Sequence, residues 1–262
     1  MTLPPLSILC LTYGRTACVR EILECYRRCE YDGTLELLLL NDEPQQTLFV
    51  DHVFGKQKTV SVINRGERYT SLGAKRNEAV MQADHDHFLF VDDDDLFLPW
   101  YPQDMMLAFQ VWNRPTYPNA YLFGEGRGVD MELQIKQETH PGSYLAPKRH
   151  LFLVGGYPPV YVKGDQYLRA KLHTTFACRA DQHPKPCKRP GYIYRWGNGT
   201  YHISGNPDHA TAWARTHADL QQRMDRGEEP DGFIPLFPEW EIDYALLAAG
   251  APMAAPQPHH QG

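Results

Sequence analysis

Four consecutive aspartates, Asp92 to Asp95, directly follow a short apolar segment, Phe88 to Val91. Carboxylates this close repel one another strongly where the dielectric constant is low, so they need positive charge nearby. A hard divalent cation, Mg²⁺ or Mn²⁺, supplies that charge and binds carboxylate oxygens while leaving room for substrate phosphates. The alternative is a solvated acidic turn or helix start, where aspartate is also favoured. The apolar segment before the aspartates favours the metal site.

A second carboxylate, Asp165, opens the segment from Gly164 to Leu168. An aspartate at the start of a helix caps it, which stabilises the helix by about 1 kcal/mol. The same carboxylate acts as a general base if it takes the proton from an attacking hydroxyl group. Taken alone, the residue favours the cap. Its place some 70 residues after the aspartate cluster, just past the string "VGGYPP", favours catalysis.

Two adjacent cations, Lys75 and Arg76, lie in the segment Gly73-Ala74-Lys75-Arg76-Asn77. The small residues of this segment allow close approach of another group, and the cations suit a diphosphate. The alternative is a helix whose basic side chains are merely solvated.

Elements that would position these side chains follow from the hydrophobic pattern. Short apolar segments alternate with amphipathic ones, which is typical of βαβ units. We predict buried strands at residues 6–11, 35–40, 59–63 and 88–91, with helices at 15–29 and 72–83. Ligands of open α/β sheets bind at the carboxyl ends of the strands. The turn after the first strand and the aspartates that end later strands are therefore expected at the ligand-binding edge.

The second half of the chain is less regular. We expect helices at residues 100–112 and from 165 onward, and a hairpin within 120–137. Residues 1–205 are predicted to form the main domain. A helical extension at 206–247 and a disordered tail of Ala, Pro, Gln and His at 248–262 are expected to follow.

Composition is that of a soluble globular protein, with 42% hydrophobic and 22% charged residues among 262. The net charge of −6 argues against a surface that binds polyanions everywhere. No apolar segment approaches the 18 residues of a transmembrane helix, and the N-terminus does not resemble a signal peptide. The six cysteines lack paired Cys-x-x-Cys spacing, which indicates reduced thiols. We therefore expect a cytoplasmic protein without a membrane segment.

Six strings in order carry a family resemblance. They are "LSILCLTYGR", "LELLLLNDEP", "LGAKRNEAV", "HFLFVDDDDLFLP", "VGGYPP" and "GDQYLRAKL". Together they resemble the family 2 glycosyltransferases of GT-A fold over roughly residues 5 to 205. The resemblance implies an α/β fold with a mostly parallel sheet flanked by helices. It also implies a transferase that uses a nucleotide-sugar donor and a bound divalent metal, Mn²⁺ or Mg²⁺.

The resemblance assigns roles to single residues. Its Asp-x-Asp motif corresponds to Asp92-Asp93-Asp94, with Asp94 as the direct metal ligand and Asp92 facing the ribose and the metal's waters. Some GT-A enzymes supply a third ligand where this chain has His202. Asp165 matches the general base of inverting members. The implied donor-binding residues are Thr12, Tyr13, Arg15, Asp42, Lys75, Arg76, Asp92 and Asp93.

The nucleotide-base assignment departs from the family pattern. Asp42 resembles the aspartate that contacts uracil or ribose. The family usually shows two aspartates followed by a small residue, whereas this chain shows Asn41-Asp42-Glu43. The base assignment therefore rests on Asp42 alone.

We predict transfer of a sugar from a nucleotide-diphosphate donor, a UDP-sugar above others, to an acceptor hydroxyl with inversion. A non-catalytic nucleotide-sugar or glycan-binding module on the same scaffold is the alternative. Asn41 and Gly164 favour it, since the family usually has acidic residues there. A nucleotidyltransferase ranks lower, because we see no glycine-rich triphosphate loop near the N-terminus. A glycan, a small molecule and a hydroxymethylated DNA base all stay open as acceptor.

Overall fold

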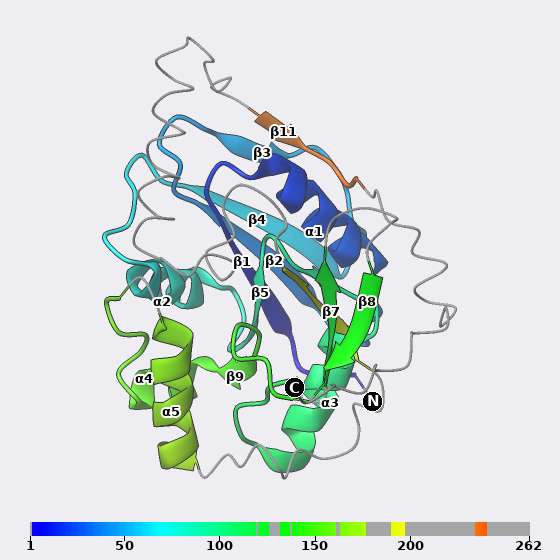
Figure 1. The fold of residues 1–262 in the computed structure, drawn as a ribbon. Helices are drawn as coiled ribbons and strands as arrows, with labels where there is room; N and C mark the ends of the chain where they lie inside the picture. Colours follow the sequence, from blue (N-terminus) through cyan, green and yellow to red (C-terminus); the bar gives the residue numbers. More distant parts are fainter. Residues whose placement is uncertain are drawn as a thin grey trace, which may run out of the picture.

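The computed structural model describes residues 2–118, 120–125, 132–136, 138–160, 163–176, 190–196 and 234–239 (Figure 1). His202, most of the expected helical extension and the expected disordered tail lie outside these ranges. Within the described ranges, no helix has both the length and the apolar character needed to cross a membrane.

The central sheet is built from the four apolar segments predicted as strands. They form β1 (Leu6–Thr12), β2 (Leu35–Asn41), β4 (Lys58–Asn64) and β5 (His87–Asp92). These strands pair in parallel in the order β4-β2-β1-β5. Every residue of β1 and β2 is buried, as expected for central strands of a parallel sheet covered on both faces. An unpredicted short strand, β9 (Leu145–Pro147), joins β5 in antiparallel orientation.

Helices cover both faces of this sheet (Figure 1). On one face α1 (Thr16–Arg28) and α3 (Tyr101–Trp112) share a buried cluster with alternate residues of β1 such as Ile8. On the other face α2 (Leu72–Gln82), α4 (Lys148–Leu153) and α5 (Gly164–Phe176) share a second cluster with the intervening residues such as Leu9. The alternation follows from the two-residue period of a strand. The helices predicted at residues 15–29, 72–83, 100–112 and from 165 onward are confirmed, whereas α4 was not predicted.

A second sheet has the order β6-β10-β7-β8. The predicted hairpin is confirmed as the antiparallel pair β7 (Tyr121–Glu125) and β8 (Glu132–Lys136). The other two strands, β6 (Leu96–Phe97) and β10 (Tyr192–Trp196), were not predicted. Strand β10 lies between β6 and β7, so it links the segment after the four aspartates to the hairpin.

A two-stranded sheet pairs β3 (Leu48–Val50) with β11 (Ile234–Leu236). Strand β11 falls within residues 206–247, where a helical extension was expected, so that expectation is wrong for these three residues. Pro235 is incompatible with a helix interior but is tolerated on an edge strand. Burial of Leu236 in the core beside β3 favours the strand.

Helix α2 is locked to the loop that precedes α5. Asn77 donates from Nδ2 to the Tyr157 carbonyl (3.0 Å) and accepts from the Tyr157 backbone N–H at Oδ1 (2.8 Å). One turn earlier, Gly73 lies so close to Pro158 that a Cβ would approach its carbonyl oxygen to 1.9 Å. The close approach predicted for the small residues of this segment is thus made to the protein's own backbone. This contact joins α2, the helix that carries Lys75 and Arg76, to the loop that leads to Asp165.

Replacing Gly73 by alanine tests this packing. The new Cβ would force α2 and the loop apart, and overpacking of this kind costs about 1–3 kcal/mol. We expect the free energy of unfolding in urea to fall by that amount. The matched control is Gly66→Ala, because a Cβ on Gly66 meets nothing within 4 Å. If the two variants unfold at the same urea concentration, the close packing of Gly73 is wrong.

Candidate active site

The predicted ligand-binding residues gather at the carboxyl edge of the central sheet. Thr12 ends β1, Asp42 follows β2 and Asp92 ends β5. The register places Thr12 opposite Asn41 and Leu11 opposite Asp92. The parallel pairing of the strands therefore brings together side chains that are up to 80 residues apart in the sequence.

Arg15 compensates part of the negative charge of the aspartate cluster. Its Nε donates to Asp93 Oδ2 (3.0 Å), and its Nη2 donates to the other oxygen of the same carboxylate. Its Nη1 donates to Asp94 Oδ2 (2.8 Å). A two-pronged contact of this kind is the strong form of an arginine–carboxylate pair. The positive charge that we expected a metal to supply thus comes in part from an arginine.

Asp95 has a structural role. Its carboxylate accepts from the Tyr192 hydroxyl (2.6 Å) and from the Arg195 backbone N–H (2.9 Å), both on β10. The Arg195 side chain is fully buried, donates from Nε to the Asp94 carbonyl and pairs with Glu21 of α1 at 2.8 Å. Sequence reasoning missed Arg195. A charged residue inside the apolar string Tyr-Ile-Tyr-Arg-Trp signals a buried partner, but it does not name that partner.

Asp92 is the member of the cluster that faces outward. Its side chain is 38% exposed, and Arg76 Nη2 lies 3.7 Å from its Oδ1. Desolvation raises the pKa of Asp92 to about 7, and the charges of Asp94, Asp93 and Asp165 act in the same direction against Arg76. The protein groups around Asp92 therefore do not fully compensate the negative charge of its ionised carboxylate.

Asp165 lies in the first turn of α5, and its side chain is partly exposed. Its negative charge acts on the pKa values of Asp92 and Arg76, which places all three groups in one electrostatic neighbourhood. The residue before the helix, Lys163, has a φ of 61°, a left-handed conformation that is unfavourable for a residue with a side chain. Such strain is found at functional sites more often than elsewhere.

Lys75 and Asp42, both predicted to bind the donor, bind each other. They form a buried ion pair, and Lys75 Nζ also donates to the Thr12 carbonyl (2.6 Å). The second oxygen of Asp42 accepts from the Tyr69 backbone N–H (3.1 Å). Burial lowers the pKa of Lys75, while the charge of Asp42 acts against that decrease. The pair ties together the ends of β1 and β2 and the first turns of α2.

Tyr13 is half-buried beside Glu43. Burial raises the pKa of Tyr13 to about 12, with the Glu43 carboxylate as the next cause. The guanidinium of Arg68 lies over the Tyr13 ring at 4.0 Å from its centroid. An aromatic ring, a carboxylate and a cation thus meet at the end of β1.

His140 is a further residue near Asp92 that the sequence did not single out. Its ring is buried among Tyr121, Tyr192 and Tyr194, with centroid distances of 4.9, 5.2 and 4.6 Å. A Cβ on Gly142 would lie 2.9 Å from His140 Cε1 and 3.1 Å from Asp92 Oδ2. Burial lowers the pKa of His140 to about 4, so the ring is neutral near pH 7. A loop histidine of this kind carries no recognisable spacing signal.

The described residues contain no group of three or more His, Cys, Asp or Glu side chains placed to hold a metal ion. Mg²⁺ and similar cations need only one or two carboxylates, with waters and substrate phosphates completing the shell. The carboxylates of Asp92 and Asp94 are both solvent-accessible, at 38% and 14%, and supply hard oxygen ligands. These two residues therefore fit a divalent cation that is completed by a diphosphate.

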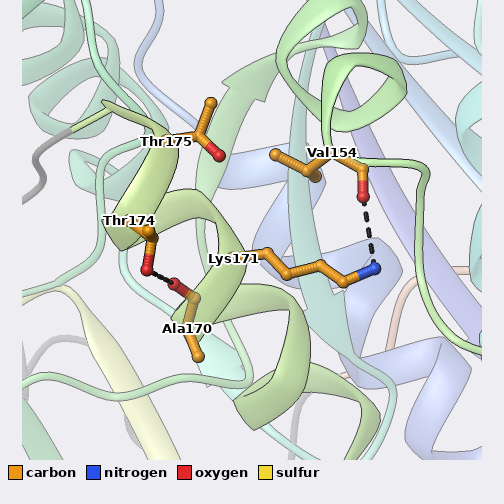
Figure 2. Close-up of a pocket in the computed structure, with 5 residues that line it drawn as sticks. All are labelled: Val154, Ala170, Lys171, Thr174 and Thr175. Carbon is orange, nitrogen blue, oxygen red and sulfur yellow. Dashed lines mark hydrogen bonds between the residues drawn. The ribbon is translucent and has the colours of Figure 1, made fainter.

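A hollow of about 350 Å³ lies elsewhere, between the end of α4 and the outer side of α5 (Figure 2). Its polar groups bind each other: Lys171 Nζ donates to the Val154 carbonyl (3.3 Å) and Thr174 Oγ1 to the Ala170 carbonyl (3.0 Å). None of the predicted ligand-binding residues lines it. The hollow is therefore separate from the candidate active site.

The family model for glycosyl transferase family 2 matches residues 7–153, more than half of the 262 residues. The chain belongs to this family. The match includes the carboxyl edge with its aspartate cluster and stops before the Asp165 helix, so the family assignment covers the part of the candidate site that precedes α5. A search of curated proteins returned no match to this family 2 glycosyltransferase.

Solved structures of TarS share the GT-A fold with this member of the family. A fragment of TarS from S. aureus matches with a TM-score of 0.50 and 16% identity, over 74% of this chain and 60% of that one. The same fragment in complex with UDP-GlcNAc matches with a TM-score of 0.51 and 14% identity, over 86% and 73%. The mannosyltransferase PcManGT from Pyrobaculum calidifontis, in complex with GDP-Man and Mn²⁺, reaches 0.48 at 12% identity, over 87% and 65%. The first of these matches spans less than two thirds of the TarS fragment.

Replacing Arg195 by methionine tests whether its contacts with the Asp94 carbonyl and Glu21 stabilise the turn formed by the aspartates. The change leaves the buried Glu21 carboxylate without this cation, and breaking a buried pair costs about 3–5 kcal/mol. We expect the double variant with Glu21→Leu to recover part of the loss, because an apolar pair of similar size replaces the charges. Urea unfolding measures both effects.

The control is Arg20→Met on α1, the helix that carries Glu21. The ion-pair partner of Arg20, Glu239, has a side chain that is 47% exposed. A loss of at most about 1 kcal/mol is expected for such a surface pair. If Arg195→Met costs no more than this control, Arg195 does not hold the aspartate turn.

Proposed function

We propose that this protein transfers a sugar from a nucleotide-diphosphate donor, a UDP-sugar, to an acceptor hydroxyl with inversion at the anomeric carbon. The observation that carries the proposal is the meeting of Asp92, Arg76 and Asp165 in one electrostatic neighbourhood. They come from three separate elements, β5, α2 and α5. Membership of glycosyl transferase family 2 and the shared GT-A fold support it.

The donor lies along the carboxyl edge of the sheet in this proposal. Thr12, Tyr13 and Asp42 line the end of β1 and β2, where the nucleoside would bind. Arg76 is buried beside Asp92, and its guanidinium would face the diphosphate. An arginine suits this role because its charge is permanent and its donors match phosphate oxygens.

Other proposed donor residues act by holding the site in shape. Arg15 fixes Asp93 and Asp94 through its two-carboxylate contact. Lys75 fixes the Thr12 carbonyl and Asp42. Such prearranged charges cost no reorganisation when the reaction occurs.

We propose Asp92 and Asp94 as ligands of Mn²⁺ or Mg²⁺, with His202 as a third ligand outside the described residues. When bound, the metal would neutralise charge on the leaving nucleotide. Through this metal, Asp92 and Asp94 would hold the donor diphosphate. The raised pKa of Asp92 is consistent with a cation at this place.

Asp165 is the proposed general base. It lies in the first turn of α5, and loop residues Tyr157 and Pro158 before this helix contact α2. The carboxylate would take the proton of the acceptor hydroxyl as that oxygen attacks the anomeric carbon. A single displacement of this kind inverts the anomeric configuration. The transfer step needs no second nucleophilic carboxylate.

We further propose a cytoplasmic location. The four cysteines among the described residues are all free and buried, which suits a reducing compartment.

Asp165→Asn tests the base. Donor turnover, followed as nucleotide release, should fall by a factor of about 10² to 10⁴ because the amide cannot accept the proton. Binding of the donor should be unchanged, since the predicted donor contacts lie elsewhere. The matched control is Asp104→Asn, another first-turn aspartate on α3. Near wild-type turnover in a folded Asp165→Asn protein would rule out this base.

A thermal-shift panel tests the donor and the metal. UDP-, GDP-, dTDP- and CDP-sugars are each added with Mn²⁺ or with EDTA. We expect a UDP-sugar with Mn²⁺ to raise the melting temperature by several degrees. A ligand present at 100 times its Kd stabilises the folded state by roughly 2.7 kcal/mol. EDTA should abolish the shift.

Asp92→Asn should also abolish the metal-dependent shift. The control Asp86→Asn changes the aspartate that directly precedes the opposite end of β5 and should keep the shift. A shift that survives EDTA contradicts the metal assignment. No shift with any donor in the presence of Mn²⁺ contradicts donor binding itself.

A further inference from the structure

The surface formed by the end of α4 and the outer side of α5 combines exposed apolar side chains with lysines. Phe152 and Leu153 are the last two residues of α4 and are 55% and 71% exposed. Tyr167 of α5 is 55% exposed. Lys163, just before α5, and Lys171, one turn after Tyr167, are exposed as well. We call these five residues the α4–α5 surface; none of them is a proposed donor, metal or base residue.

The end of α4 and the outer side of α5 lie against each other. Helix α4 stops at a sharp turn because Gly155 and Gly156 have φ values of 79° and 74°, which only glycine adopts easily. Tyr167 and Lys171 are four residues apart, so they lie on one face of α5. Lys171 Nζ donates to the carbonyl of Val154, the residue that follows α4 (Figure 2). The exposed residues of the two helices therefore border the same hollow.

The charge of this region is opposite to that of the whole chain. Residues 148–160 and 163–176 contain five lysines and arginines and one carboxylate, Asp165, whereas the net charge of the chain is −6. Within the described residues, no ion pair joins Lys163 or Lys171 to a carboxylate. The positive charge of the α4–α5 surface is therefore available to an anionic partner.

The kinds of residue on this surface favour an anionic lipid bilayer over a protein partner. Lysine is depleted at protein–protein interfaces. At a membrane, by contrast, phenylalanine and leucine enter the boundary between headgroups and acyl chains, and tyrosine lies at the level of the headgroups. Lysines beside them attract anionic lipids. The acidic remainder of the chain is repelled by the same lipids, which would orient this surface toward the bilayer.

We infer that the α4–α5 surface binds an anionic lipid bilayer, with the two apolar residues of α4 inserted between the headgroups and the two lysines on lipid phosphates. The inference goes beyond the proposed function and does not depend on it. Because Asp165 lies in the first turn of α5, binding would hold the candidate active site near the bilayer surface.

The test is co-sedimentation of the full chain with lipid vesicles, without donor or metal. One set of vesicles is phosphatidylcholine alone, and the other contains about 30% phosphatidylglycerol to supply negative charge. We expect the wild type to bind the anionic vesicles about 10-fold more strongly than the neutral ones. The double variant Phe152→Ser with Leu153→Ser should bind the anionic vesicles about 10-fold more weakly than the wild type, because the inserted apolar area is lost. Lys171→Glu should weaken this binding about fivefold or more, because it replaces an attracted charge by a repelled one.

Two controls make the same kinds of change away from this surface. Val53→Ser removes an apolar side chain that is 87% exposed in the loop after β3. Lys56→Glu reverses the charge of an exposed lysine in the same loop. Both controls should bind the anionic vesicles as the wild type does, and urea unfolding checks that every variant is folded.

Wild-type protein that binds neither set of vesicles, or binds both equally, overturns the inference. Unchanged binding by the folded double variant overturns it too. A dimer that forms without vesicles and is lost in the double variant would overturn it in favour of a second copy of the chain as the partner. Nucleotide release tests the proposed function separately, so a failure of vesicle binding does not count against sugar transfer.

Discussion

The crowding of four carboxylates at the end of β5 is the constraint on which the rest of the site depends. Three of the four aspartates bind groups from other elements. Arg15, after β1, pairs with Asp93 and Asp94. Strand β10 takes Asp95 through Tyr192 and a backbone N–H. Only Asp92 keeps substantial exposure, beside the buried Arg76. These contacts fix Asp93, Asp94 and Asp95 in place and leave Asp92 as the carboxylate with the greatest exposure.

The support reaches across both faces of the sheet. Arg195 lies beneath the aspartate turn and pairs with Glu21 on α1, so the first helix is coupled to the end of β5. On the other face, Gly73 and Asn77 couple α2 to the loop before α5. The relative position of Arg76 and Asp165 therefore depends on the packing between α2 and this loop. Rigid elements of this kind hold reacting groups more precisely than free loops do.

Adjacent residues of similar chemistry have separate tasks at this edge. Asp42 and Glu43 are neighbours, but Asp42 pairs with a buried lysine, whereas Glu43 accepts from a backbone N–H and lies beside Tyr13. Asp94 and Asp95 differ likewise, since Asp94 pairs with Arg15 and Asp95 accepts from β10. In both pairs the partner decides the role, since a buried carboxylate is stable only with donors or cations around it. Residue type alone does not separate a structural carboxylate from a ligand-binding one.

The sequence by itself determined the central strands, the helices between them and the edge where Asp42 and Asp92 would lie. These features follow from local periodicity, because a strand repeats every two residues and a helix every 3.6. The tertiary structure decided the partners. The Tyr192–Asp95 contact joins residues 97 positions apart, and Lys75–Asp42 joins residues 33 apart. Strand β10 and His140 carry no strong local pattern, since their places are fixed by packing against distant elements. Local sequence sets which way a side chain points from its own element, whereas the charge that meets it depends on how the whole chain folds.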